Sequence, residues 1–163
     1  MERVGYPITP AVRLLKEQKI EFHPHLYRYV DKGGTAHSAA ELKVSEHSVI
    51  KTLIFETEKR DPLVVLMHGD REVSTKTLAR VIGAKNISPC DPVVAHRHSG
   101  YQIGGTSPLG MRKALPVYAE RTIFDLDVIY INGGKRGFLV SLRPARLKSL
   151  LAITEVDVAI RSR

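Results

Sequence analysis

Apolar residues fall into short runs along the chain, separated by glycine, proline and polar residues. Runs rich in β-branched and aliphatic side chains predict buried strands. Strands are expected at residues 22–30, 49–55, 63–67, 116–119, 128–131 and 138–142. The longest purely aliphatic run, Leu63 to Met67, is far shorter than the about 20 residues that a membrane span needs. No membrane partner is therefore expected.

Helix starts and ends are marked by capping residues. Thr9 followed by Pro10, and Asp91 followed by Pro92, combine a capping side chain with proline at the first helical position. Ser38 with Glu41 forms a capping-box pattern. One helix is predicted to start at Pro10, and a second, short one runs from Ser38 to near Val44. A third is predicted between Ser74 and Gly83, with Leu78, Val81 and Ile82 facing inward. Two more are predicted at 93–98 and 144–151.

The order of these elements indicates the fold class. Helices and strands interleave, but several strands follow one another through tight glycine turns, which favours a mixed α/β fold with a curved, partly antiparallel sheet. A length of 163 residues suits a single domain spanning 1–163. No strand-to-helix turn carries a GxGxxG or P-loop motif, so no nucleotide cofactor is expected.

The charge balance favours a polyanionic partner. Lysine and arginine number 25 against 17 acidic residues, a net charge of +8, which favours nucleic acid before an anionic membrane. Residues 135–163 carry seven of these cations and two acids. The single cysteine, Cys90, excludes an intrachain disulfide framework, and the N-terminal segment lacks the features of a signal peptide. The predicted location is the cytoplasm.

Three segments carry candidate chemistry, and each also has a purely structural explanation. Lys51 is the only charge within 49–55, so it is either a solvent-facing residue of an edge strand or a partly desolvated ammonium at a pocket. The segment 104–110 holds three glycines and two hydroxyls, and is either a tight turn or a loop that offers amide donors. The segment 133–137 is either a phosphate cradle or a basic hairpin tip that aids solubility.

Histidine and cysteine give weaker signals. His23 with His25, and His96 with His98, are spaced two apart, but no nearby cysteine completes a metal site, so none is expected. Cys90 has no evident base beside it, which is typical of a small buried or loop thiol.

Several short motifs follow one another along the chain, and their ordered set is more specific than any one of them. In order they are Thr9-Pro10-Ala11, His25-Leu26-Tyr27, Val49-Ile50-Lys51-Thr52-Leu53, Gly83-Ala84-Lys85, Gly100-Tyr101-x-x-Gly104-Gly105-x-Ser107-Pro108-Leu109-Gly110 and Ile129-Tyr130-x-x-Gly133-Gly134-Lys135-Arg136-Gly137. This set resembles the YbaK family of aminoacyl-tRNA deacylases, relatives of the editing domain of bacterial prolyl-tRNA synthetases. The resemblance covers nearly the whole chain.

The resemblance implies a barrel-like mixed sheet flanked by helices and an activity that clears mischarged tRNA, with Cys-tRNA(Pro) the usual substrate. It implies no metal and no cofactor. The implied partners are the acceptor end of tRNA(Pro) and, in some members, prolyl-tRNA synthetase. The implied mechanism uses the substrate's own thiol, which attacks the ester carbonyl and releases tRNA as a thiolactone forms.

The resemblance also assigns residues. Lys51, Gly104 and Tyr27 would lie at the reacting ester, with Lys51 orienting the ester and the terminal adenosine. The residues expected to shape the pocket or to border the acceptor end are Gly105, Thr106, Ser107, Pro108, Gly110, Lys135, Arg136 and Gly137.

Two departures leave the amino-acid specificity open. Where the family often has an acidic residue, this chain has Leu139, and Ser141 is the nearest polar alternative. The histidine-aspartate pair that commonly follows the strand tyrosine is also replaced around Tyr29-Val30-Asp31. The alternatives are an Ala-tRNA(Pro) deacylase that uses water and a non-catalytic module that binds a tRNA acceptor end or a synthetase.

Overall fold

The computed structural model describes residues 5–162, so part of the N-terminal segment used for the signal-peptide prediction, residues 1–4, lies outside it. The helices are α1 Pro10–Glu17, α2 Gly34–Leu42, α3 Thr75–Ile82, α4 Pro92–Ser99 and α5 Ala145–Leu150, with 3-10 turns η1 Glu46–Ser48 and η2 Arg121–Asp125. The strands are β1 His23–Leu26, β2 Ile50–Thr57, β3 Pro62–His68, β4 Arg71–Val73, β5 Ile87–Pro89, β6 Val117–Glu120, β7 Ile129–Lys135, β8 Phe138–Leu142, β9 Ile153–Val156 and β10 Ala159–Arg161.

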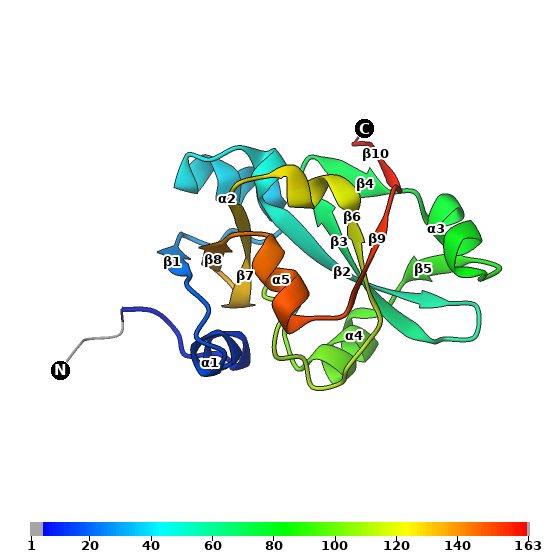
Figure 1. The fold of residues 1–163 in the computed structure, drawn as a ribbon, viewed down its shortest axis with the longest axis horizontal. Coiled ribbons are helices and arrows are strands. Elements are labelled where there is room, and N and C mark those ends of the chain that lie inside the picture. Colours follow the sequence, from blue (N-terminus) through cyan, green and yellow to red (C-terminus); the bar gives the residue numbers. More distant parts are fainter. Residues whose placement is uncertain (1–4, 163) are drawn as a thin grey trace.

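The strands form three sheets (Figure 1). A five-stranded sheet has the order β5-β2-β3-β6-β9, in which β3, β6 and β9 run parallel and the other pairs antiparallel. An antiparallel sheet has the order β1-β8-β7, and β10 pairs with β4. The predicted mixed α/β class is confirmed.

The predicted barrel is not closed. The two larger sheets meet through one isolated parallel bridge, between Val49 and Tyr130. Beyond that bridge, β2 pairs with β3 but not with β7. Residues 50–53 of β2 and Asn132 of β7 line a cavity instead of pairing with each other. The cavity therefore takes the place of the strand pairing that would have closed the barrel.

Most capping predictions are confirmed by side-chain hydrogen bonds. Thr9 Oγ1 accepts from the amide of Val12 at the start of α1, and Asp91 accepts from the amide of Val93 at the start of α4. The Ser38 prediction is wrong: α2 begins at Gly34, and Ser38 is a buried residue inside it whose hydroxyl donates to the Thr35 carbonyl. A hydroxyl inside a helix can bond a carbonyl of the preceding turn, so the capping-box pattern is ambiguous.

Two further predictions need correction. The strand expected at 22–30 covers only His23–Leu26, because the chain then leaves the sheet toward the cavity. In α3, Leu78 is buried as predicted, whereas Val81 is 56% exposed.

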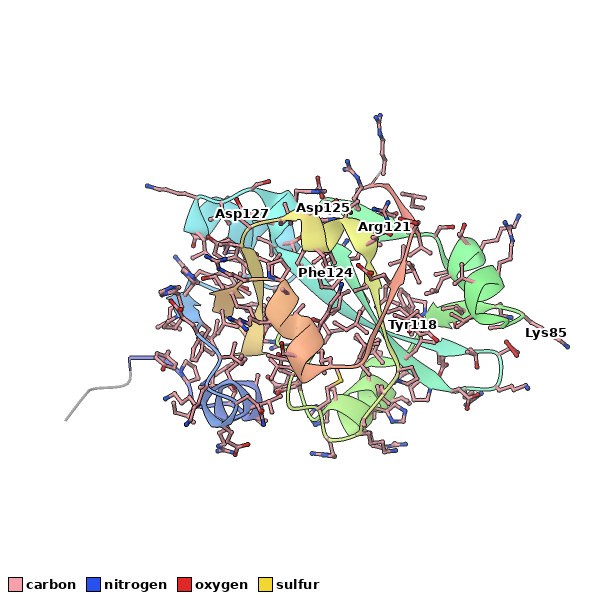
Figure 2. All side chains as sticks on the ribbon, viewed as in Figure 1. Lys85, Tyr118, Arg121, Phe124, Asp125 and Asp127 are labelled. Atoms are coloured by element: carbon pink, nitrogen blue, oxygen red, sulfur yellow. The ribbon has the colours of Figure 1, made fainter. Side chains whose placement is uncertain are left out.

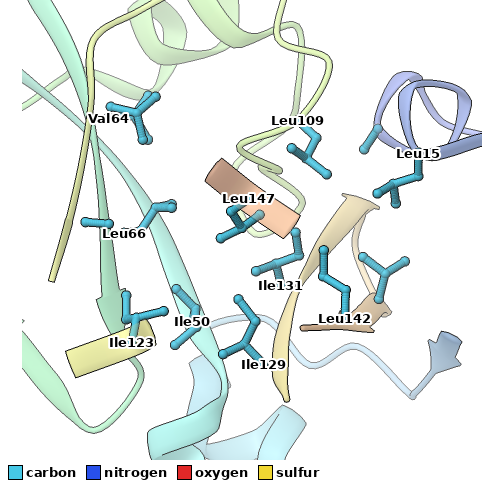
Figure 3. Close-up of a cluster of buried hydrophobic side chains, with 14 of the residues drawn as sticks. Leu15, Ile50, Val64, Leu66, Leu109, Ile123, Ile129, Ile131, Leu142 and Leu147 are labelled. Carbon is cyan, nitrogen blue, oxygen red and sulfur yellow. The ribbon is translucent and has the colours of Figure 1, made fainter. Parts of the chain in front are cut away.

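Two apolar cores lie on opposite faces of β3, whose residues are buried on both sides. Val64 and Leu66 join the larger core, and Val65 and Met67 join the smaller one. In the larger core, Leu147 of α5 lies between these β3 side chains and the strand β7 (Figure 3). The three-stranded sheet is thereby anchored to the five-stranded one.

The segment that follows β6 forms a solvated edge of the molecule. It carries Arg121, Asp125 and Asp127 along the outside (Figure 2), and the Arg121 guanidinium pairs with Asp157 at 3.1 Å. Among residues 5–162, no helix is long and apolar enough to cross a membrane.

Candidate functional site

A cavity of about 390 Å³ lies between the start of β2, the segment that leads from β1 into α2, and the glycine-rich loop around Gly104. Its wall is largely apolar and aromatic, with a few polar groups. The lining residues used below are Tyr27, Tyr29, Thr35, His37, Ser38, Val49, Lys51, Thr52, Ile103, Gly104, Thr106, Asn132 and Leu139. A concave, mostly apolar site with few polar groups is typical of small-ligand binding.

Lys51 is a half-buried cation in the wall of this cavity. Its Nζ donates a hydrogen bond to the Arg71 carbonyl at 2.5 Å. Burial lowers the pKa of the Lys51 ammonium, and the nearby carboxylates, Glu72 first, oppose that shift. Of the two alternatives for Lys51, a solvent-facing residue of an edge strand and a partly desolvated ammonium at a pocket, the structure supports the second. In this position, Lys51 can face an ester or a phosphate oxygen.

Tyr27 and Tyr29 line the same cavity, and Tyr27 is held at the end of β1. The Tyr27 amide donates to the Gly137 carbonyl at 2.9 Å, which ties the end of β1 to the β7–β8 hairpin. Burial raises the pKa of the Tyr27 phenol, so this group stays neutral near pH 7. Its ring lies 6.0 Å from the ring of His37, whose Nε2 is held by the Arg28 carbonyl at 2.6 Å.

The glycine-rich loop is divided between cavity and interior. Gly104 and Thr106 line the cavity, and the backbone of Gly104 is exposed. Ser107 and Pro108 do not line it: both are buried, and Ser107 Oγ accepts from the Leu109 amide at 3.2 Å. Gly110 packs against the backbone at the start of α1.

The β7–β8 hairpin supports this loop from outside. Gly105 lies directly against the backbone of 135–136. Arg136 Nε donates to the Ile103 carbonyl at 2.9 Å, and its guanidinium carbon lies 5.1 Å from the centroid of the Tyr29 ring. Lys135, Arg136 and Gly137 do not line the cavity, and both cations are exposed at the hairpin tip.

Several lining residues had no signal that the sequence analysis used. Asn132 is a polar residue directly after the apolar run 129–131 of β7, a signal that could have been read in the same way as that of Lys51. Thr35 and His37 line the cavity from the first turn of α2, which begins at Gly34, before the predicted start at Ser38. In the described part of the chain, the buried hydroxyl of Thr52 has no hydrogen-bond partner.

The wall at Leu139 is apolar. Leu139 is 4% exposed and packs in a small cluster with Ala39 and Val49. Ser141 does not replace the missing acid, because its hydroxyl is bonded to His25 Nε2 at 2.8 Å and does not line the cavity. The cavity surface at Leu139 is therefore uncharged, whereas Asp31, Lys32 and Lys51 contribute charged groups to the same lining.

The remaining candidates lie away from the cavity. Burial, together with the neighbouring Glu56 carboxylate, raises the pKa of the Cys90 thiol to about 11, so Cys90 is not a thiolate at neutral pH. Within residues 5–162, no three histidine, cysteine or acidic side chains gather as a metal site would require.

Comparisons with known proteins identify the family and the fold. A model of the aminoacyl-tRNA editing domain family matches residues 32–150. EbsC of Enterococcus faecalis, a candidate Cys-tRNA(Pro)/Cys-tRNA(Cys) deacylase, is 29% identical over 143 residues, 87% of each chain. The proline–tRNA ligase of Streptococcus equi subsp. zooepidemicus is 30% identical over 109 residues, which are 66% of this chain but 18% of the ligase. A solved structure described as a candidate trans-editing enzyme for prolyl tRNA synthetase has a TM-score of 0.79 at 19% identity, covering 96% of this chain and 100% of that one.

Proposed function

Because the chain belongs to the aminoacyl-tRNA editing domain family, we propose that it cleaves the aminoacyl ester of mischarged tRNA and that Cys-tRNA(Pro) is its main substrate. One observation carries the proposal: the half-buried ammonium of Lys51 and the exposed backbone of Gly104 line the same cavity. A cation and amide donors beside an ester carbonyl stabilise the negative charge that develops on its oxygen.

Such an activity has a physical purpose. A pocket that accepts proline cannot strongly reject a similarly small side chain, because one methylene changes binding by only about 1–3 kcal/mol. A second site that destroys the wrong ester corrects the error. The likeness to EbsC, whose name specifies cysteine esters, supports cysteine as the amino acid removed.

The proposed reaction uses the substrate's thiol as the nucleophile. The thiol loses its proton, its sulfur attacks the ester carbonyl carbon, and the bond from that carbon to the ribose oxygen breaks. The ribose oxygen takes up a proton, which leaves free tRNA and cysteine thiolactone. The protein then has to position the ester and stabilise charge, as Lys51 and Gly104 could do. The raised pKa of Cys90 agrees with a site that needs no nucleophile of its own.

The uncharged wall around Leu139 suits a small side chain and also favours a second substrate, Ala-tRNA(Pro). That substrate has no thiol and would require water as the nucleophile. We further propose the tRNA acceptor end as the macromolecular partner, with prolyl-tRNA synthetase as a second partner that delivers it.

The test is release of free tRNA from Cys-, Ala- and Ser-charged tRNA(Pro) under one set of conditions. Lys51→Ala should lower turnover of the preferred substrate by about 100-fold or more. Lys59→Ala, an exposed lysine at the β2–β3 turn, is the matched control and should behave as wild type. Wild-type turnover by Lys51→Ala would refute the assignment of Lys51. Tight tRNA binding without release from any of the three substrates would favour the non-catalytic module.

A further inference from the structure

Two consecutive carbonyls of the glycine-rich loop are each held by a side chain of the β7–β8 hairpin. Arg136 Nε donates to the Ile103 carbonyl at 2.9 Å, and Asn132 Nδ2 donates to the Gly104 carbonyl at 3.1 Å. Inside the loop, the amide of Gly105 donates to the Gln102 carbonyl at 2.9 Å, so the peptide between Gly104 and Gly105 is held by a turn of the loop and by Asn132 together. Its orientation therefore depends in part on a strand nearly thirty residues further along the chain.

Asn132 is itself fixed by its other end. Its Oδ1 accepts from the amide of Gly134 at 2.7 Å and from the amide of Lys135 at 3.1 Å. Two amide donors on one end identify that end as the oxygen and leave the amide nitrogen for Gly104. These contacts lie at the irregularity in the β7–β8 pairing between Asn132 and Lys135. The strand thus presents a rigidly oriented donor to the loop.

The two ends of the Gly104 residue are consequently unequal. Its carbonyl is engaged by Asn132, whereas its amide has no hydrogen-bond partner within residues 5–162. That amide lies in one rigid plane with the Ile103 carbonyl, which Arg136 holds, and the Gly104 carbonyl held by Asn132 lies in the next peptide plane. The hairpin thus restrains Gly104 on both sides of its Cα atom, and a restrained backbone with an unpaired amide is what a preorganised donor requires.

We propose that Asn132 is a positioning residue that orients Gly104 so that its amide serves the reacting carbonyl. This inference rests on the proposed function, and it assigns Asn132 an action through Gly104 and not through contact with the substrate. Misplacement of a catalytic group by about 1 Å can cost about 100-fold in rate, so the effect should appear in kcat.

Asn132→Asp tests the contact with little change of shape. The new carboxylate still accepts from the amides of Gly134 and Lys135, but it places an oxygen against the Gly104 carbonyl and repels it. We expect kcat for Cys-tRNA(Pro) to fall about 10- to 100-fold, with KM changed less than about twofold. In a two-dimensional NMR spectrum, the amide signal of Gly104 should move. The matched control is Asn86→Asp, which changes the chain's other asparagine and should alter neither readout.

Each outcome decides a different question. No turnover by the wild-type protein would refute the proposed function itself. With an active wild type, unchanged kcat in Asn132→Asp, or a raised KM at unchanged kcat, would refute the positioning role alone. Asn132→Ser removes the amide nitrogen without adding charge, and it should lose a similar share of kcat. If the aspartate variant does not fold, a folded serine variant with kcat within about twofold of wild type would refute the role equally.

Discussion

The two glycine-rich segments, 100–110 and 133–137, have similar composition but different tasks. The first places Gly104 and Thr106 in the cavity wall, whereas in the second, Lys135, Arg136 and Gly137 stay outside the cavity. Arg136 of the second segment and Asn132, directly before it, instead hold the first segment. Both segments have the small residues expected of an anion-binding loop, yet in the second the amides of Gly134 and Lys135 are bonded to Asn132, and only the first segment borders the cavity.

Their glycines show why. A Cβ atom on Gly105 would lie 2.9 Å from the Arg136 amide nitrogen, and one on Gly137 would lie 2.7 Å from the Tyr27 carbonyl oxygen. A Cβ on Gly110 would lie 2.7 Å from the carbonyl carbon of Pro10. These glycines allow backbones to pack closely against one another. A glycine motif can therefore indicate contact between two segments as well as contact with a ligand.

Among the variants that test the close packing of these glycines, Gly110→Ala should lower the stability of the protein most. Gly110 has a φ of +68°, and the added Cβ would meet backbone atoms of Pro10 and Ala11 that cannot move independently. A left-handed alanine costs about 1–2 kcal/mol, and overpacking adds about 1–3 kcal/mol. We expect the free energy of unfolding, measured in urea, to fall by about 2–5 kcal/mol.

Gly83→Ala separates the two contributions. Gly83 has a φ of +78° at the end of α3, but no atom lies within 4 Å of its added Cβ. This control should lose only the conformational cost of about 1–2 kcal/mol. Equal losses in the two variants would mean that close packing at Gly110 is not important.

The sequence predicts the local parts of this arrangement better than the long-range ones. Caps such as Thr9 and Asp91 act within three residues, so the α1 and α4 starts follow from local chemistry. The sequence shows Lys51 as a charged residue in an apolar strand. Whether it lies at a solvent-facing edge or at a pocket depends on the segments that face it in the fold.

The missed residues depend on pairings between distant segments. Asn132 reaches the site because the β7–β8 hairpin packs on a loop far earlier in the chain, and His37 lines it from α2, which starts earlier than the pattern at Ser38 suggests. Leu139 illustrates the same limit. Its substitution for an acid was visible in the sequence, but its burial beside Ala39 and Val49 came only from the fold.

Gly105→Ala should weaken the contact between the two segments themselves. The Cβ would approach the backbone of 135–136, and the loop would have to move away from the hairpin. We expect a loss of about 1–3 kcal/mol in urea unfolding, together with slower tRNA release, because Gly104 moves with the loop. Gly5→Ala, where the added Cβ meets nothing within 4 Å, is the control. Reduced stability with unchanged turnover would show that the hairpin is not needed to position Gly104.

The smallest effect concerns the hairpin's charge. Lys135 and Arg136 are exposed at its tip, and if they contact phosphates of the tRNA acceptor end, Lys135→Gln with Arg136→Gln should weaken tRNA(Pro) binding. Each lost contact to single-stranded phosphate should reduce the slope of log affinity against log salt by about 0.7. Titrations between about 50 and 200 mM salt measure this slope.

The control for that pair removes the same charge at the opposite end of the molecule, by Arg80→Gln with Lys85→Gln. Lys85 projects outward at the end far from β7 (Figures 1 and 2). This control should leave the slope close to that of wild type, since the net charge of the two variants is equal and only its position differs. Equal slopes in the two double variants would mean that Lys135 and Arg136 contribute only general charge, and the hairpin would then act solely by holding Ile103 and Gly104 in place.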